Sequence, residues 1–224
     1  MSVRDMPLKA LADSHYRAVD DDLAELRRNN ENEGVPLILT ETEGLLRLIT
    51  GITHPRKILE LGTAHGYSSL FFARSLPDAV ITTIERNPVM IEAAKAEFAK
   101  RKESGRIDLR TGDAAAILQE ITEELRDADD SLKYDFAFID AAKSHYREFF
   151  EYIEKICTRD AVIVCDNILL KGWIVEADGS AARRHRTSIK YMKQFLDYLD
   201  KREDLDVTIL TGGDGLAIIR FRNE

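Results

Sequence analysis

Short apolar segments alternate with longer helix-like stretches through the middle of this chain, and this alternation constrains the fold more than any other feature. Seven segments are rich in β-branched and apolar residues and have the length of strands. Strands separated by helices are typical of βαβ units, which build a parallel sheet covered by helices. The predicted strands are residues 57–61, 80–85, 106–110, 134–140, 161–166, 207–210 and 216–221.

The last two predicted strands are joined by only five residues, Thr211 to Gly215. Because a crossover between parallel strands needs a dozen residues or more, one of these two strands must run antiparallel. The 224 residues suit a single α/β domain over residues 1–224, with N-terminal helices in 1–50 and a Rossmann-like core in 56–224. Helices are predicted at residues 7–30, 41–50, 68–76, 88–102, 114–125 and 145–156.

The composition excludes several classes of protein. No apolar run approaches the roughly 20 residues that a bilayer span needs, and no signal peptide is recognisable at the N-terminus. The two cysteines, Cys157 and Cys165, form neither a zinc motif nor a disulfide framework. We therefore expect a cytoplasmic protein without a membrane partner. A net charge of −8 argues against coating nucleic acid by bulk electrostatics, although a local basic patch is compatible with it.

The first predicted strand contains Glu60 near its end, and a glycine-rich turn with Gly62, Gly66 and Ser68 follows it. Glycines at a strand-to-helix turn let a ligand approach the backbone, and the helix that follows offers free N–H groups. The Gly-x-x-x-Gly spacing differs from that of dinucleotide-binding turns and P-loops, so a pyrophosphate is not the expected ligand.

Two further polar positions follow the second and third predicted strands. Glu85 lies 23 residues after Gly62, where an acidic residue can accept both hydroxyls of a ribose. Asp113 and Ala114 begin the stretch after the third strand and are placed to contact an adenine. Each feature alone is compatible with an ordinary turn or a solvated strand end, but together they predict a crevice for a nucleoside.

Oxygen ligands follow the fourth and fifth predicted strands, where Asp140 ends one strand and Asp166 and Asn167 end the other. Two carboxylates and an amide oxygen suit Mg²⁺, Mn²⁺ or Ca²⁺ rather than zinc. The alternative is that Asp140 caps a helix and that the Asp-Asn pair forms a turn. Lys143 lies three residues after Asp140. A cation beside it would disfavour its ammonium form, so that Lys143 could act as a general base.

Six stretches together resemble the metal-dependent class I O-methyltransferases, which include the catechol and caffeoyl-CoA O-methyltransferases. They are ILELGTAHGYSS, VITTIERNP, TGDAA, YDFAFIDAAKSHY, AVIVCDN and GGDGLAII. The resemblance implies a seven-stranded Rossmann-like sheet with one antiparallel strand, and a homodimer. It implies Lys143 as the catalytic base and metal ligation by Asp140, Asp166 and Asn167. It also implies S-adenosylmethionine bound by Ile38, Glu60, Gly62, Ser68, Glu85, Asp113, Ala114 and Asp140.

Within that family the chain most resembles bacterial tRNA 5-hydroxyuridine methyltransferases (the TrmR type). This resemblance implies methylation of the 5-hydroxyl of 5-hydroxyuridine at the wobble position of a tRNA anticodon stem-loop, giving 5-methoxyuridine. A basic stretch is compatible with phosphate binding, and Trp173 could stack on a base. The alternative acceptor is a small aromatic diol of the catechol or caffeoyl-CoA type, because both acceptors present neighbouring oxygens to a metal. The candidate RNA-binding residues are Lys171, Arg183, Arg184, Arg186 and Lys190.

Overall fold

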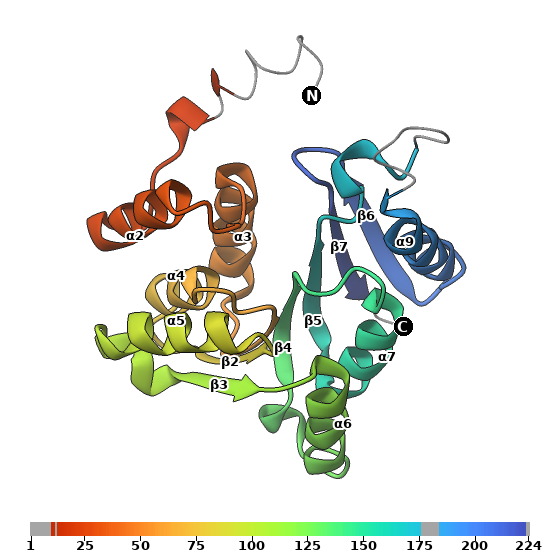
Figure 1. The fold of residues 1–224 in the computed structure, drawn as a ribbon. Coiled ribbons are helices and arrows are strands. Elements are labelled where there is room, and N and C mark those ends of the chain that lie inside the picture. The colour runs from red at the N-terminus through yellow and green to blue at the C-terminus, as the bar shows by residue number, and fades with distance from the viewer. Residues whose placement is uncertain (1–9, 12, 176–183, 223–224) are drawn as a thin grey trace.

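The structure, a computed structural model, describes residues 10, 11, 13–175 and 184–222. In this part of the chain, seven strands form one sheet in the order β3-β2-β1-β4-β5-β7-β6, with helices packed on both faces (Figure 1). The first five strands pair in parallel, and β7 runs antiparallel between β5 and β6. The predicted fold class, a mostly parallel Rossmann-like sheet with one antiparallel strand, is therefore confirmed.

Burial along the strands follows their place in the sheet. The central strands β1 and β4 are buried along almost their whole length, because helices cover both faces. The edge strands β3 and β6 keep several exposed positions. The strands are β1 (Lys57–Leu61), β2 (Val80–Glu85), β3 (Ile107–Thr111), β4 (Tyr134–Ile139), β5 (Cys157–Asp166), β6 (Leu205–Leu210) and β7 (Leu216–Phe221).

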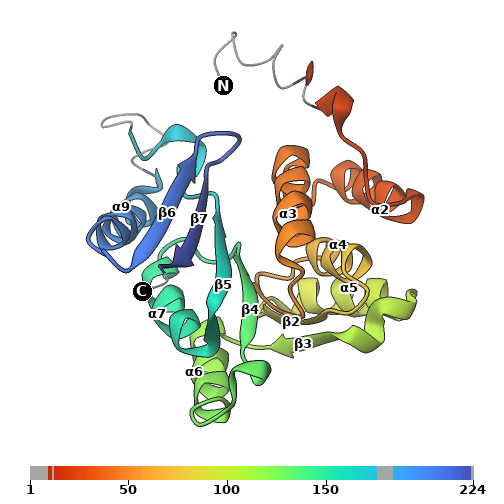
Figure 2. The same cartoon turned by 180° about the vertical axis from the view of Figure 1, so that it is seen from behind.

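Two apolar clusters separate the sheet from its helices. One face carries α6 (Ala114–Glu124), α7 (Tyr146–Ile156) and α9 (Arg186–Asp200). The opposite face carries α2 (Asp21–Asn32), α3 (Thr40–Thr53), α4 (Tyr67–Ser75) and α5 (Pro88–Ala99). Figure 2, which shows the molecule from behind, has the two groups of helices on either side of the sheet. Three short 3₁₀ turns, η1 (Lys102–Arg106), η2 (Asp130–Leu132) and η3 (Leu170–Gly172), complete the described elements. None of the described helices is long and apolar enough to cross a membrane.

The predicted continuous helix over residues 7–30 is wrong within the described residues. Residues 10, 11 and 13–15 are helical, and the helix then stops before α2 begins at Asp21. The break occurs because Asp20 adopts extended backbone angles and its carboxylate accepts the N–H of Leu23 at 2.9 Å. This is an N-cap, which competes with continuation of a preceding helix.

The strand order places a crevice at the carboxyl end of the sheet. The chain leaves β1 toward β2 on one side, whereas β4 lies on the other side of β1. In doubly wound folds the loops diverge at such a point and leave room for a ligand. The loops that follow β1, β2, β3 and β4 all open at this edge, and they contain Gly62, Asp113, Asp140 and Lys143.

The packing of α9 against α7 can be tested by mutation. Phe195 is fully buried against the rings of Tyr146 and Phe150, whereas Tyr191 on the same helix is 44% exposed. We expect Phe195→Ala to lower the free energy of unfolding by about 3–5 kcal/mol and Tyr191→Ala to change it by less than about 1 kcal/mol. Urea denaturation measures both. Equal losses of unfolding free energy in the two variants would contradict the burial of Phe195 between α9 and α7.

Candidate active site

Two adjoining cavities occupy the carboxyl edge of the sheet. The larger, of about 350 Å³, is lined by residues from the loops after β1, β2, β3 and β4. The smaller, of about 30 Å³, lies between the glycine turn and residues 36–38. Both are lined by Gly62 and Asp140, so they form two ends of one site. The sequence-predicted residues that line them are Ile38, Gly62, Ser68, Glu85, Asp113, Ala114 and Asp140.

Gly62, directly after β1, lies against the backbone of Asp140, directly after β4. The N–H of Asp140 donates to the carbonyl of Leu61 at 2.9 Å. A Cβ on Gly62 would lie 2.1 Å from the backbone oxygen of Asp140, and the φ angle of +101° belongs to the region that favours glycine. The backbone conformation therefore requires glycine at position 62. Because this residue has no side chain, the two cavities adjoin each other beside it.

Glu60 is a fully buried carboxylate beneath this turn. Its Oε2 atom accepts hydrogen bonds from Ser69 and, at 2.6 Å, from Thr83, whereas Oε1 has no partner among the described residues. Burial raises the pKa of Glu60 to about 7. An unpartnered buried carboxylate oxygen next to the smaller cavity fits the ammonium group of an amino-acid ligand, as expected for S-adenosylmethionine.

Glu85 and Asp113 lie at the larger cavity and also organise the backbone. The carboxylate of Glu85 accepts three backbone N–H groups, from Ala64, Arg86 and Asn87, at 2.8–3.0 Å. Asp113 is the N-cap of α6. Both side chains therefore have local structural roles, but an ionised carboxylate offers about four acceptor positions. Each side chain keeps acceptor capacity for a ligand hydroxyl or amine.

Asp140 and Asp166 lie at the ends of the paired strands β4 and β5. Asp166 is 3% exposed, and burial, followed by the charge of Asp140, raises its pKa to about 7. This concentration of buried negative charge fits a divalent cation. Asn167, at φ +57°, follows directly. Among the described residues no group of three or more His, Cys, Asp or Glu side chains is arranged to hold a metal ion, so the predicted set depends on the amide of Asn167 as its third ligand.

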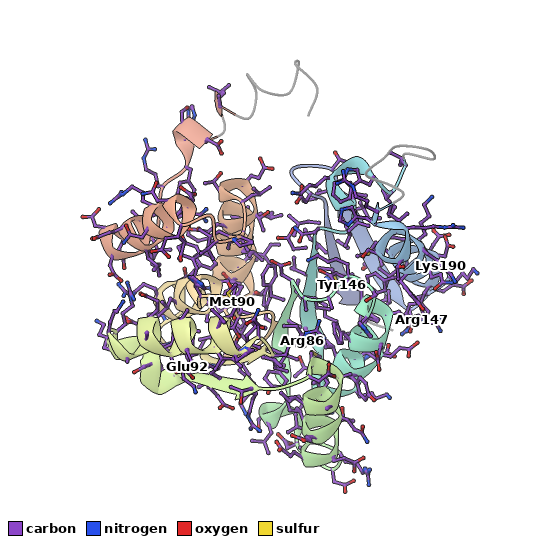
Figure 3. The ribbon with its side chains drawn as sticks, viewed as in Figure 1. Arg86, Met90, Glu92, Tyr146, Arg147 and Lys190 are labelled. Carbon is purple, nitrogen blue, oxygen red and sulfur yellow. The ribbon has the colours of Figure 1, made fainter. Side chains whose placement is uncertain are left out.

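Lys143 contacts Asp140 and Tyr146. Its Nζ donates to Asp140 Oδ1 at 2.5 Å and to the hydroxyl of Tyr146 at 3.2 Å. Tyr146 is 1% exposed and its hydroxyl donates to the carbonyl of Asp166 at 2.8 Å. Tyr146, labelled in Figure 3 at the start of α7, therefore links Lys143 to the end of β5.

Sequence reasoning assigned no role to Tyr146, although it ends the stretch YDFAFIDAAKSHY. The available signal was its spacing of three residues from Lys143, which places two side chains on the same side of a helical turn. That signal was insufficient, because the contact with β5 depends on how α7 packs on the sheet.

Four of the five candidate RNA-binding residues lie in the described part of the chain. Lys171, Arg184, Arg186 and Lys190 are exposed, and Arg183 lies outside the described residues. Lys190, labelled in Figure 3, lies on α9. The ring of Trp173 stacks on His185, with centroids 4.3 Å apart and planes 14° from parallel. One face of the aromatic ring expected to stack on a base is thus already covered.

Comparison with known proteins adds an independent finding. The family model described as O-methyltransferase matches residues 14–222. A catechol O-methyltransferase from Niastella koreensis is 28% identical over 90% of this chain and 91% of its own length. Caffeoyl-CoA O-methyltransferase 1 from Zea mays is 27% identical over 92% of this chain and 81% of its own length.

Similarity extends to solved structures. The O-methyltransferase TomG from Streptomyces achromogenes, involved in tomaymycin synthesis and solved in complex with S-adenosylmethionine, superposes with a TM-score of 0.81. It is 25% identical, and the match covers 100% of both chains. The whole described fold, rather than one motif, is therefore shared.

The close approach at Gly62 generates a stability prediction. We expect Gly62→Ala to lower the free energy of unfolding by about 2–4 kcal/mol, because the added methyl group collides with backbone and the φ angle is strained. The matched control is Gly105→Ala, where an added Cβ meets nothing within 4 Å, and it should stay within about 0.5 kcal/mol of wild type. Urea denaturation of the two variants measures the difference, and a Gly62→Ala protein as stable as wild type would refute the constraint.

The buried Glu60 generates a pH prediction. The pKa of Glu60 is about 7 in the folded protein, whereas the ordinary value is 4.5. At a pH between these two values the unfolded chain therefore releases a proton that the folded chain retains. Stability should therefore fall as the pH rises through this window, by up to about 3 kcal/mol. Glu60→Gln should remove this contribution to the dependence of the free energy of unfolding on pH. Urea denaturation of ligand-free protein at pH 5 and pH 8 measures it, and parallel slopes for the two proteins would exclude the assignment.

Proposed function

This chain belongs to the O-methyltransferase family, and from that premise we propose that it methylates one of two neighbouring oxygens on a small aromatic acceptor. The methyl donor in this proposal is S-adenosylmethionine, and the second cofactor is a divalent cation, Mg²⁺ or in its place Mn²⁺ or Ca²⁺. The acceptor belongs to the catechol or caffeoyl-CoA class. Relatives with those names, similar over most of the chain, support this choice of acceptor.

One observation carries the proposal, the meeting of Asp140, Asp166 and Lys143 at the ends of β4 and β5. The two carboxylates are close enough for the charge of Asp140 to raise the pKa of Asp166, and Lys143 lies 2.5 Å from Asp140. The carboxylates of Asp140 and Asp166 would hold a hard divalent cation and would leave coordination positions open for other oxygens. An acceptor with vicinal oxygens could occupy those positions as a chelate.

The proposed cofactor-binding residues divide between the two cavities. Glu85 and Asp113, in the larger cavity, would accept the ribose hydroxyls and the adenine amine. Glu60, below the smaller cavity, would pair with the ammonium group of the methionine part. S-adenosylmethionine supplies a methyl group on a positively charged sulfur, and the residues of the two cavities contribute chiefly by aligning that group with the acceptor oxygen.

Lys143 is the proposed base. A cation held by Asp140, Asp166 and Asn167 would favour the anionic form of an acceptor hydroxyl. The neutral amine of Lys143 would accept the hydroxyl proton at Nζ, where Asp140 Oδ1 and the Tyr146 hydroxyl would stabilise the resulting ammonium. Bound S-adenosylmethionine would supply the methyl group to the acceptor oxygen.

A second candidate acceptor is 5-hydroxyuridine in a tRNA anticodon, whose 5-hydroxyl and C4 carbonyl offer the same pair of oxygens. The exposure of Lys171, Arg184, Arg186 and Lys190 favours it. The stacking of Trp173 on His185 disfavours it, because a base would have to compete for that ring or use its other face. The small acceptor is therefore the first choice.

Parallel assays of methyl transfer test the proposal. We expect turnover of catechol, a rate for phenol lower by at least about 100-fold, and loss of activity in EDTA that Mg²⁺ restores, since a single oxygen cannot form the chelate. Asp166→Asn should lower kcat/KM for catechol by a similar factor. Mass spectrometry of the products, with a tRNA anticodon stem-loop bearing 5-hydroxyuridine as the competing acceptor, provides the measurement.

The matched control is Asp206→Asn, which alters an exposed carboxylate on β6 paired with Arg222 at 2.8 Å. It should leave kcat/KM unchanged. Full turnover in chelator, or equal rates for catechol and phenol, would sink the metal-chelate proposal. Methylation of the stem-loop without methylation of catechol would select the tRNA acceptor instead.

A further inference from the structure

The connection between α2 and α3 covers one end of the proposed cofactor site. Pro36, Leu37 and Ile38 line the smaller cavity opposite Gly62 and Ser68. These residues belong to neither helix nor strand, so no hydrogen-bonded ladder fixes their position. Contacts from neighbouring helices must hold them against the glycine turn.

Arg27 on α2 makes the principal contacts. Its two terminal nitrogens both donate to the carbonyl of Ile38 at 3.1 Å, and one of them also donates to Glu43 Oε2 at 2.6 Å. Its Nε donates to the hydroxyl of Tyr67 at 3.2 Å. Arg27 and Glu43 are 6% and 1% exposed. A planar guanidinium buried in this way fixes the connection, α3 and α4 in a single geometry.

The hydroxyl groups of two tyrosines also contact Glu43. The hydroxyl of Tyr67 donates to Glu43 Oε2 and that of Tyr16 to Glu43 Oε1, both at 2.7 Å. Burial raises the pKa of each tyrosine, so both hydroxyls stay protonated and donate. Tyr67 is the first residue of α4, directly after Gly66, and also lines the smaller cavity. The cluster therefore touches both sides of that cavity.

A second pair of hydrogen bonds links the same segments. The ring Nδ1 of His65, in the glycine turn, bonds to Asn30 Oδ1 at 3.0 Å. The backbone carbonyl of Asn30 accepts the N–H of Val35 at 2.9 Å. The end of α2 is thus tied at once to the glycine turn and to the start of the connection.

We propose that Arg27, Glu43 and Tyr67 form a positioning cluster that holds residues 36–38 over the methionine end of S-adenosylmethionine. This inference rests on the proposed function. Affinity for that end of the cofactor depends on the cluster, whereas affinity for the nucleoside end, bound in the other cavity, does not. Buried ion pairs contribute little net stability compared with apolar residues of similar volume, so fixing one geometry is the better account of this cluster.

Two ligands that differ in the methionine part test the inference. S-adenosylhomocysteine carries the amino-acid part, and 5′-methylthioadenosine lacks it. We expect Arg27→Gln to raise the Kd of S-adenosylhomocysteine by about tenfold or more, because charge-assisted hydrogen bonds that hold the connection are lost. The Kd of 5′-methylthioadenosine should stay within about twofold. Isothermal titration calorimetry measures both without any turnover.

Tyr67→Phe is the milder second variant, since it removes one hydroxyl and keeps the pair between Arg27 and Glu43. It should weaken S-adenosylhomocysteine binding severalfold with the same selectivity, and it decides the question if Arg27→Gln does not fold. Arg202→Gln is the matched control. It removes an arginine that pairs with Glu154 and Asp204 at 2.9 and 2.7 Å, and both Kd values should equal those of wild type.

The outcomes separate the two proposals. Equal weakening of both ligands, or an unchanged Kd of S-adenosylhomocysteine in a folded variant, overturns the positioning role. A wild-type protein that binds neither ligand overturns the proposed function instead.

Discussion

The close approach of Gly62 and Asp140, which follow β1 and β4, is the constraint on which the rest of the site depends. The Asp140 N–H bonds to the carbonyl of Leu61, and only a residue without a Cβ fits beside the Asp140 carbonyl. Gly62 and Asp140 line both cavities, and the Asp140 side chain pairs with Lys143. Asp140 therefore lies beside the proposed donor site and beside the proposed base.

Two buried carboxylates near the carboxyl end of the sheet oppose folding at neutral pH. Glu60 and Asp166 are buried carboxylates whose pKa values are raised to about 7, mainly by burial. Groups of this kind oppose folding at neutral pH unless a cation or donor compensates them. An ammonium group beside Glu60 and a divalent cation beside Asp166 would supply that compensation. A purely structural role does not explain two such carboxylates near the carboxyl ends of β1 and β5.

Much of this arrangement could be predicted from local pattern. The bounds predicted for β1, β2 and β7 coincide with those observed, because a buried strand between turn residues has a clear period and clear ends. Local pattern failed at the N-terminus, where the N-cap at Asp20 divides a stretch that looked continuously helical. It also missed the early start of β5 at Cys157, which depends on pairing with Tyr134 across the sheet.

The sequence by itself determined the order along the chain of the strands and of the helices between β1 and β5, the glycine at the turn and the acidic residues at the strand ends, but it did not predict α9. These follow from periodicity and from backbone rules that act over a few residues. Only the tertiary structure decided that Tyr146 links Lys143 to β5, that His185 covers Trp173, and that Arg27 reaches Ile38, Glu43 and Tyr67. Such contacts join segments far apart in the chain, and their geometry is set by how helices pack on the sheet, which no local pattern encodes.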